Sequence, residues 1–107
     1  MTWHAARVRV VFDAELWLWE ARRVDRRTFV TLPADVFDEI QGRTAWSQGG
    51  FGSVRVRATI GGSTWTTSIF PDSPNGVYVL PVNQKVRRAE ALDVGDVASV
   101  TVELIDP

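Results

Sequence analysis

The strongest constraint on the fold of this chain is an alternation of apolar and polar residues that recurs through most of its length. Apolar residues occupy every second position within residues 54–60, and the segment 97–105 repeats the pattern. A period of two is that of a β-strand with one face buried and the other face in water. The alternation therefore predicts a mostly β protein in which one face of each strand contributes to a common core.

Two short helices are expected between the strands, each beginning near a proline. Pro33 suits the first helical position, because its missing N–H would have no partner there. Val36 and Ile40 lie four residues apart and form a buried stripe, and Gly42 is expected to end this helix. The second helix follows Pro81 and turns two apolar residues inward, Val86 and Ala89.

Glycine-containing and polar segments predict the turns between strands. Gly61-Gly62 permits positive φ at both positions, which favours a two-residue hairpin turn. The polar stretch 21–27 is expected to form a turn before the strand 28–32. A further tight turn is expected at 93–96, immediately before the last strand.

The order of elements is repeated along the chain. Residues 29–33 and 78–81 each end a strand in Leu-Pro, and a helix, a glycine turn and a second strand follow both. This plan resembles the half-barrel of AbrB- and MazE-type proteins, in which a Gly-Asp pair such as Gly95-Asp96 makes a turn and its aspartate bonds backbone amides. Two intertwined halves remove the free edges of a sheet. We expect a small closed double-split β-barrel with two short helices, built from two similar strand-helix-strand halves in one domain, 1–107, with a core of about residues 7–105.

A series of motifs runs through the chain in a fixed order, at residues 29–33, 50–56, 65–71, 78–82, 86–90 and 95–96. Together these motifs resemble the bacterial DUF1905 family, a domain of unknown function, over about residues 8–104. The resemblance implies a double-split β-barrel with two short helices and no established activity; similar domains occur fused to a bacteriocin-protection (OmdA-like) domain. Where this family often has a lysine early in the second helix, this chain has Asn83, and Lys85 is the neighbouring lysine.

The composition excludes several kinds of chemistry. The chain has no cysteine, which removes disulfides, thiolate catalysis and cysteine-bound zinc. Its one histidine, His4, precedes the first predicted strand, so neither a Ser-His-Asp triad nor a metal or other cofactor is expected. The formal net charge is −1, which gives no general attraction to nucleic acid or to an anionic membrane.

The longest uninterrupted apolar runs contain four residues, at 16–19 and 77–80. A helix that spans a membrane needs about 20 apolar residues, and even a signal peptide needs a longer apolar segment than these. We therefore expect no membrane partner and a cytoplasmic location.

The candidate ligand-binding residues are aromatic, basic and hydroxyl side chains. Three cations follow a strand on the second predicted helix, where they could bind an anionic or polar ligand; the alternative is that Arg87 or Arg88 bonds backbone carbonyls or Asp96. Two aromatic residues lie in a segment without periodicity, and loops on rigid scaffolds often bind ligands, although such residues can also simply cover the barrel. The full set is Trp46, Phe51, Trp65, Ser68, Lys85, Arg87 and Arg88.

The densest basic segment contains four arginines within the predicted hairpin, which could contact phosphates as loops do in AbrB-like proteins; they are Arg22, Arg23, Arg26 and Arg27. The alternative is solvated charge, partly neutralised by Glu20 and Asp25. Other arginines alternate with core residues and are expected to face outward beside acidic partners such as Glu103; they are Arg7, Arg9, Arg55 and Arg57.

No set of residues predicts an active site. Asp35, Asp38 and Glu39 cluster on the first helix, where a solvated helix face accounts for them. The glycines at 49–52 lack the Gly-Lys-Ser/Thr of a phosphate-binding loop, and a strand follows them instead of a helix.

We therefore expect a non-enzymatic accessory module that binds a small ligand or a protein partner, as a monomer or a weak homodimer. Its binding surface would combine the 46–51 segment with Ser68, Arg87 and Arg88. The alternative is an AbrB-like DNA-binding protein that uses the four hairpin arginines, and a third hypothesis is an enzyme of unknown activity.

Overall fold

The computed structural model describes residues 9–22, 25–44 and 52–105, the side chains of 20–26 and 42–44 excepted. The elements in chain order are β1 (Arg9–Glu15), β2 (Trp17–Arg22), β3 (Asp25–Thr31), α1 (Ala34–Thr44), β4 (Val54–Ile60), β5 (Ser63–Asp72), the 3₁₀ turn η2 (Ser73–Asn75), β6 (Val77–Pro81), α2 (Gln84–Ala89) and β7 (Val97–Leu104). The protein is mostly β, with two α-helices in these ranges, as the alternation predicts.

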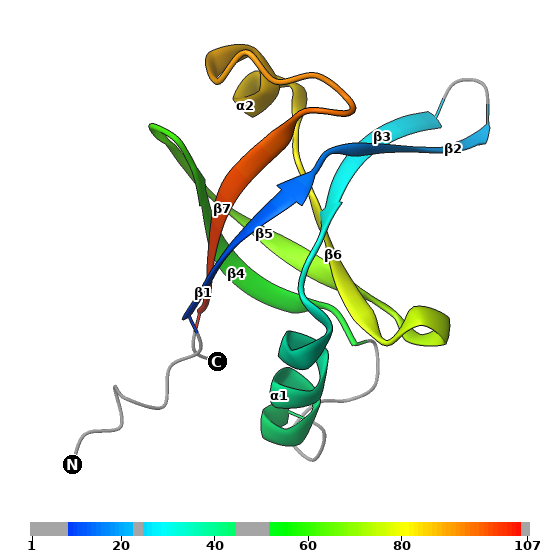
Figure 1. Ribbon diagram of the computed structural model, residues 1–107. Helices are drawn as coiled ribbons and strands as arrows, with labels where there is room; N and C mark the ends of the chain where they lie inside the picture. Colours follow the sequence, from blue (N-terminus) through cyan, green and yellow to red (C-terminus); the bar gives the residue numbers. More distant parts are fainter. Residues whose placement is uncertain (1–8, 23–24, 45–51, 106–107) are drawn as a thin grey trace.

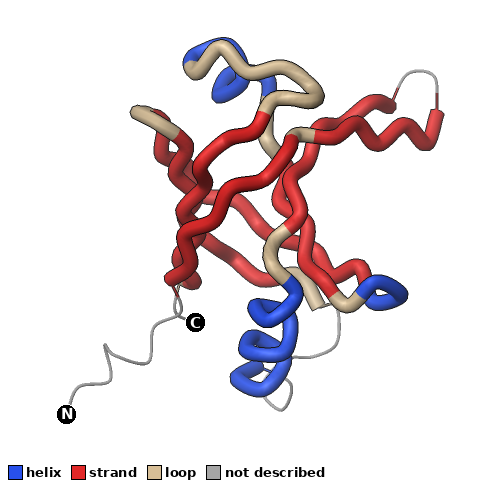
Figure 2. Tube along the Cα trace, in the orientation of Figure 1, coloured by secondary structure: helices blue, strands red, loops and turns tan. Residues whose placement is uncertain are grey.

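The strands of the described ranges form one antiparallel sheet in the order β1-β7-β4-β5-β6-β3-β2. The hairpin predicted at Gly61-Gly62 is confirmed, because Ile60 pairs with Ser63 across it. The sheet curls on itself, and α1 and α2 lie at opposite ends of it, as Figure 1 and Figure 2 show.

The expectation of a closed barrel is wrong, because the sheet is a curled half-barrel. Among the described residues, β1 pairs with β7 alone and β2 pairs with β3 alone, so no ladder joins the two ends of the strand order. The reason is connectivity: Leu16 is the single residue between β1 and β2, so these strands run end to end and do not lie side by side. Leu16 is fully buried, and its N–H donates to the carbonyl oxygen of Asp96 at 2.9 Å.

The turn before β7 has the chemistry predicted for a Gly-Asp pair. Gly95 adopts a φ of 96°, a left-handed conformation that glycine tolerates best. The Oδ2 atom of Asp96 accepts a hydrogen bond from the backbone N–H of Asp93 at 2.8 Å. Since the N–H of Gly95 also donates to the carbonyl oxygen of Leu16 at 2.8 Å, this turn holds the junction of β1 and β2 in place.

The inward faces of the strands and the apolar stripes of both helices form one core. Its buried members are Leu16, Val30, Leu32, Val36, Ile40, Val54, Val56, Ala58, Ile60, Ile69, Tyr78, Leu80, Val82, Val86, Ala98, Val100 and Val102. The predicted alternation of 54–60 and of 97–105 is therefore confirmed as a pattern of burial.

The helices confirm some local expectations and correct others. The side chain of Asn83 caps α2, because its Oδ1 accepts a hydrogen bond from the N–H of Val86 at 2.9 Å. Ala89 is exposed instead of buried, since α2 has only 6 residues and Val86 fills its inward side. α1 continues past Gly42 to Thr44, because an internal glycine costs a helix only about 1 kcal/mol. Neither helix in the described ranges has the length and apolar character needed to cross a membrane.

The polar segment 21–27 forms less of a turn than expected. β2 continues to Arg22 and β3 begins at Asp25, and these two residues lie opposite each other. The turn expected over 21–27 is therefore shorter, because both of its ends continue as strand.

Candidate functional site

The predicted ligand-binding residues do not form one site in the part of the chain that the structure describes. Trp65 and Ser68 lie on opposite faces of β5, because the strand alternates and the two residues differ in parity. Trp65 packs against the core, whereas Ser68 faces outward opposite Arg55 of β4. Several other candidates lie outside the described residues: His4, Arg23, Trp46, Gly49, Gly50 and Phe51.

Arg87 has a structural contact on α2. Its Nε atom donates a hydrogen bond to the carbonyl oxygen of Val82 at 3.3 Å, which is one of the two roles considered for this residue. Lys85 and Arg88 are exposed on the same short helix. An anion approaching α2 would therefore meet Lys85 and Arg88 first.

The end of the sheet that carries α2 lies away from Ser68. Glu90 follows α2, and its Oε2 accepts a hydrogen bond from the Oγ of Ser63 at 2.6 Å, which fixes the helix beside the β4–β5 turn. Ser68 lies five residues further along β5, about 16 Å at the rise of a strand. The α2 cations and Ser68 therefore belong to different parts of the surface.

The basic segment lies on the β2–β3 hairpin, which extends beyond the body of the sheet (Figure 1). Arg27 is exposed, and the backbone register places Arg26 opposite Glu20. Arg22 likewise lies opposite Asp25. The backbone register thus places two of the four arginines opposite acidic residues.

The acidic residues of α1 do not gather around a site. Asp35, Asp38 and Glu39 are exposed. In the described ranges, no group of three or more His, Cys, Asp and Glu residues is arranged to hold a metal ion. The solvated helix face remains the simplest account of this cluster.

At the α1 end of the sheet, one buried phenol has a defined partner. Tyr78 of β6 is fully buried, and the Nε2 of Gln41 donates a hydrogen bond to its hydroxyl oxygen at 2.8 Å. Burial raises the pKa of Tyr78, and the hydrogen bond from Gln41 partly opposes that rise. The rings of Phe37 and Tyr78 lie 5.3 Å apart, so this contact attaches α1 to the sheet.

A surface that the sequence reasoning did not identify lies on the outer side of β2, β3, β6 and β5. We call it the aromatic face and define it as Trp17, Trp19, Phe29, Phe70, Val79 and Pro81. The register places these residues on one side of the sheet, because paired residues in an antiparallel ladder share a face. One row runs Trp17–Phe29–Pro81 across three strands, and the next runs Thr31–Val79–Phe70.

The base of the aromatic face, which we define as Trp17 and Phe29, is ordered by direct contacts. Trp17 stacks on Phe29 with ring centroids 5.2 Å apart, and this stacking contributes to the burial of Phe29, which is only 9% exposed. The Nε1 of Trp17 donates a hydrogen bond to the Oγ1 of Thr31 at 2.9 Å, which fixes the indole. Phe29 is buried and yet does not belong to the core cluster, so it is covered from the outer side.

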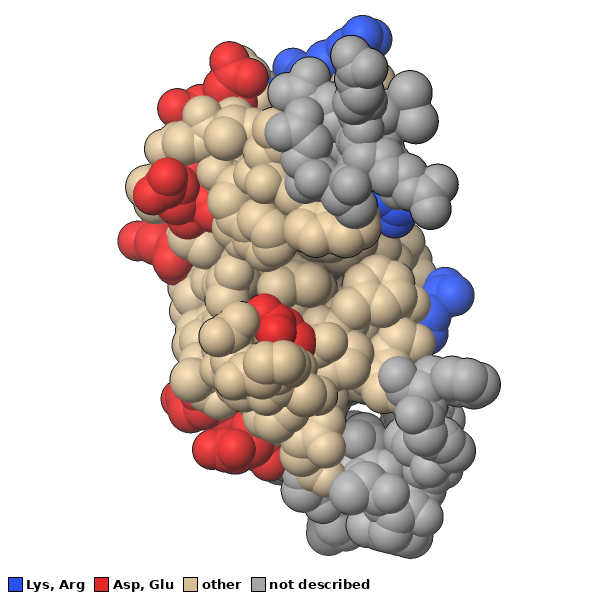
Figure 3. Space-filling view, turned by 90° about the vertical axis from the view of Figure 1, so that its right-hand side faces the viewer, with Lys and Arg blue, Asp and Glu red and all other residues tan. Residues whose placement is uncertain are grey.

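Two aromatic side chains of this face remain accessible. Trp19 is 44% exposed and Phe70 is 43% exposed. Figure 3 views the molecule from the side on which β3, β6 and η2 lie, and most of this side is uncharged, with an acidic group near its middle. Acidic side chains gather along one edge of the view and basic side chains along the other. The aromatic face can therefore bind apolar or planar groups.

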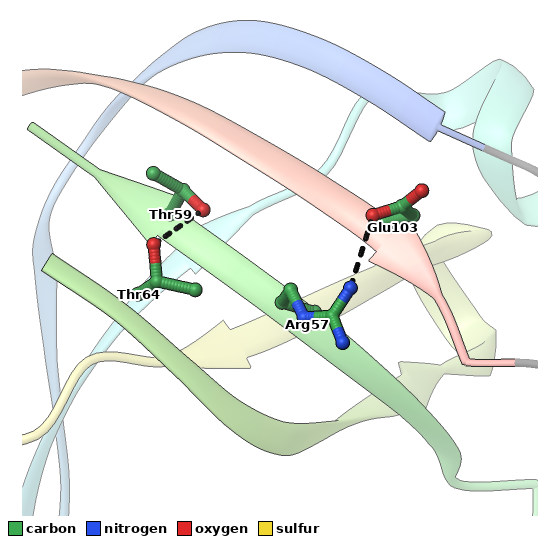
Figure 4. A network of polar contacts seen from close by, with 4 residues as sticks. All are labelled: Arg57, Thr59, Thr64 and Glu103. Atoms are coloured by element: carbon green, nitrogen blue, oxygen red, sulfur yellow. Dashed lines mark hydrogen bonds and ion pairs between the residues drawn. The ribbon is translucent and has the colours of Figure 1, made fainter.

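The outer side of β4, β7 and the first half of β5 is different. We call it the polar face and define it as Arg57, Thr59, Thr64, Thr66, Thr101 and Glu103. Arg57 Nη1 lies 3.5 Å from Glu103 Oε1, and the hydroxyls of Thr59 and Thr64 are 3.1 Å apart (Figure 4). Among the arginines expected to lie beside acidic partners such as Glu103, Arg57 does so.

One sequence signal could have revealed the aromatic face. The two four-residue apolar runs, 16–19 and 77–80, fall in or beside β2 and β6. An apolar run in a strand must place apolar side chains on both faces, because successive residues point in opposite directions. We used these runs to argue against a membrane span, but they also indicate that β2 and β6 have an apolar outer side.

The match to a known family agrees with the sequence motifs. No protein with a curated description matches the chain. Residues 12–102 match the family described as a domain of unknown function, DUF1905, and this match runs from β1 to β7. Because the match covers most of its length, the chain belongs to the DUF1905 family.

Proposed function

We propose that this protein is a non-enzymatic binding module that holds a small apolar ligand or a segment of another protein on its aromatic face. One observation carries the proposal: Trp19 and Phe70 are more than two-fifths exposed on the same outer side of the sheet. A contiguous exposed apolar patch on a small protein is typical of a binding surface. Aromatic side chains are also the residues most enriched at the energetic centre of interfaces.

The fixed positions of the Trp17 and Phe29 rings support this function. The stacking of Trp17 on Phe29 and its hydrogen bond to Thr31 hold these rings in place before anything binds. A partner that packs on a preorganised surface loses less affinity to the ordering of side chains. The aromatic face thus combines fixed rings at its centre with accessible rings at Trp19 and Phe70.

Chemical-shift mapping tests the proposal. A panel of aromatic small molecules and short apolar peptides is titrated into labelled protein, and shifts are expected at the amides of Thr31, Phe70 and Val79. Phe70→Thr should weaken binding by about tenfold, equivalent to about 1.4 kcal/mol. The matched control on the same strand is Thr66→Ser on the polar face, which should bind like the wild type. Shifts confined to α2 or to the hairpin tip would contradict the proposal.

DNA binding by the β2–β3 hairpin is the second candidate function. Its support is the projection of the hairpin from the sheet, with Arg27 exposed on it (Figure 1). A gel-shift titration against salt tests this function, since phosphate contacts make affinity fall steeply as salt rises. A protein that ignores DNA at low salt eliminates it.

A small-ligand site that uses the α2 cations remains a further prediction. Its members are the residues named from the sequence, and Lys85 and Arg88 are the exposed cations among them. Equilibrium binding of anionic metabolites with Arg88→Ala as the variant tests this site. Turnover in a broad hydrolase and transferase screen would instead support the enzyme hypothesis.

The two similar halves expected from the sequence are also part of this proposal. β3 pairs with β6, and β4 pairs with β7, so like elements meet at both contacts. The N–H of Leu32 donates to the carbonyl oxygen of Tyr78, and the N–H of Val82 donates to that of Thr28, both at 2.9 Å. A permutant that begins at Gly62 and joins the natural ends exchanges the order of the halves. It should fold with the same amide spectrum, and failure to fold would contradict their equivalence.

A further inference from the structure

We infer that the open edge of β1, which is the edge turned away from β7, pairs with the same edge of a second copy of this chain. The two sheets then extend side by side in a symmetric dimer, so the outer side of one copy does not face the outer side of the other. The inference goes beyond the proposed function, because β1 lies outside the aromatic face. The backbone, the inner face and the outer charges of β1 each support it.

The backbone of β1 has hydrogen-bonding groups along its open edge. Among the described residues, β1 pairs with β7 alone. The N–H of Leu16 donates to the carbonyl oxygen of Asp96, so even-numbered residues of β1 direct their backbone groups towards β7. The N–H of Ile105 donates to the carbonyl oxygen of Arg55, which turns odd residues of β7 towards β4 and even ones towards β1, in agreement. The residues that direct their backbone groups to the open edge include Arg9, Val11 and Asp13.

This edge is regular enough to accept another strand. Proteins commonly prevent strand addition with prolines and bulges. β1 contains no proline, and its register with β7 runs without a shift from Arg9 to Glu15. The other edge strand, β2, has a register shift between Glu20 and Arg22. β3, which pairs with β2, diverges from β1 beyond their junction (Figure 1).

The inner face of β1 is incompletely covered. Val10, Phe12 and Ala14 pack against the core but are only half-buried. The inner residues Val56 and Ala58 of β4 are fully buried, and β4 has a strand on each side. A strand added to β1 would shield its inner side chains from water, which the hydrophobic effect favours.

A two-fold axis at Val11 satisfies the backbone and both faces of β1. Val11 is 57% exposed, and it lies between exposed Arg9 and Asp13 on the outer face. With Val11 opposite Val11 of the second copy, odd residues pair with odd residues, and the open-edge N–H and C=O groups bond each other. Arg9 of each copy then lies opposite Asp13 of the other, and Val10 lies opposite Phe12 on the inner face. Both kinds of cross-strand pair are stabilising, and symmetry makes each of them twice.

The charges of the polar face continue into this junction. Arg9 lies opposite Glu103 of β7, and Glu103 Oε1 lies 3.5 Å from Arg57 Nη1 of β4 (Figure 4). Asp13 of the second copy extends this row, so the signs of charge alternate from strand to strand. An axis at Asp13 would instead place two carboxylates opposite each other, which is unfavourable. The charge pattern therefore favours the axis at Val11.

Sedimentation equilibrium of the full chain tests the inference. The wild type should dimerise with a dissociation constant between about 1 μM and 1 mM, since a junction of two short strands buries little surface. Val11→Lys should weaken the dimer by at least about tenfold, because it places two ammonium groups opposite each other at the axis. The matched control is Val97→Lys, which changes an exposed valine of β7 in the same way and should dimerise like the wild type.

Charge reversal tests the register. Arg9→Asp and Asp13→Arg should each weaken the dimer by at least about tenfold, because each brings like charges together twice. An equimolar mixture of these two variants should recover association, since every contact in the mixed dimer then joins opposite charges. Asp38→Arg on α1 carries the same change in net charge as Asp13→Arg and should dimerise like the wild type.

Several results overturn the inference. They are a wild type that stays monomeric up to about 1 mM, a dimer that ignores Val11→Lys or both charge reversals, and a mixture that fails to recover association. Amide hydrogen exchange at Val11 and Asp13 should slow as protein concentration rises, and exchange independent of concentration overturns the inference as well. A peptide that adds to β1 of a monomeric wild type has the same consequence. Phe70→Thr should dimerise like the wild type, so failure of this dimer and failure of binding at the aromatic face are distinguishable.

Discussion

The outer surface of the curled sheet has two regions that meet water in different ways. On the polar face, Arg57 pairs with Glu103 and two threonine hydroxyls bond across β4 and β5 (Figure 4). On the aromatic face, β2, β3 and β6 place rings and aliphatic side chains at the corresponding positions (Figure 3). Both regions belong to the same sheet and cover the same core, so the core does not dictate the difference.

Under the proposed function, the aromatic half of the sheet surface has a second requirement besides folding. A strand needs one apolar face to fold, and the polar face satisfies that need with alternation alone. β6 is apolar on both faces, since Tyr78 and Leu80 are buried while Val79 points outward. An apolar outer side contributes to stability only where something covers it, as Trp17 covers Phe29.

The largest expected effect is on the free energy of unfolding, and it tests whether the base of the aromatic face stabilises the fold. Phe29→Ala should lower the free energy of unfolding by about 3 kcal/mol, because it removes a buried ring and leaves Trp17 without its stacking partner. The matched change on the polar face, Thr66→Ala, should cost less than about 0.5 kcal/mol. Urea unfolding at low protein concentration measures both. Equal losses in the two variants would remove the distinction between the faces.

The sequence predicts the inner side of this molecule well and the outer side poorly. The alternation identified the buried faces of β4 and β7 because burial leaves a period of two in the residues themselves. The same period puts Trp17 and Trp19 on one face of β2, but it does not show whether that face is inner or outer. That choice depends on Leu16, whose burial orients the whole strand.

Closure of the sheet and the position of the site depend on distant contacts. The turn at Gly95 holds the end-to-end junction of β1 and β2 at Leu16. This turn lies far along the chain from Leu16, so no local pattern predicts the junction. The aromatic face gathers side chains from four strands, and no local motif joins them. By contrast, the Asn83 cap and the Gly-Asp turn are local, and their residue types predict them directly.

A second comparison makes the same substitution, threonine to valine, once on each face. Thr31→Val should lower the free energy of unfolding by about 1 kcal/mol, because it removes the acceptor for the Trp17 indole N–H. Thr59→Val on the polar face should cost less than about 0.5 kcal/mol, since its partner Thr64 is exposed and bonds water instead. Both changes keep a β-branched side chain in a strand. A larger loss at Thr59 would indicate that the polar face is the more highly ordered of the two.

A substitution at Phe70 distinguishes the contribution of the aromatic face to binding from its contribution to stability. Phe70→Thr should lower the free energy of unfolding by less than about 1 kcal/mol, because the ring is already 43% exposed and threonine suits a strand equally well. The same variant is expected to lose most binding to the face, as measured by amide shifts. A loss of stability as large as that of Phe29→Ala would assign Phe70 to the base and not to the accessible part.

The smallest effect concerns the ion pair of the polar face. A double-mutant cycle with Arg57→Gln and Glu103→Gln should give a coupling of about 0.5 kcal/mol, since Arg57 is more than half exposed. In about 1 M salt the coupling should fall towards zero, whereas the cost of Phe29→Ala should persist, because screening weakens charge pairs and not apolar contacts. A coupling that survives high salt would show that the pair is shielded from water. A weak, screened pair instead implies that Arg57 and Glu103 mainly keep this side of the sheet hydrated, which directs partners to the aromatic face.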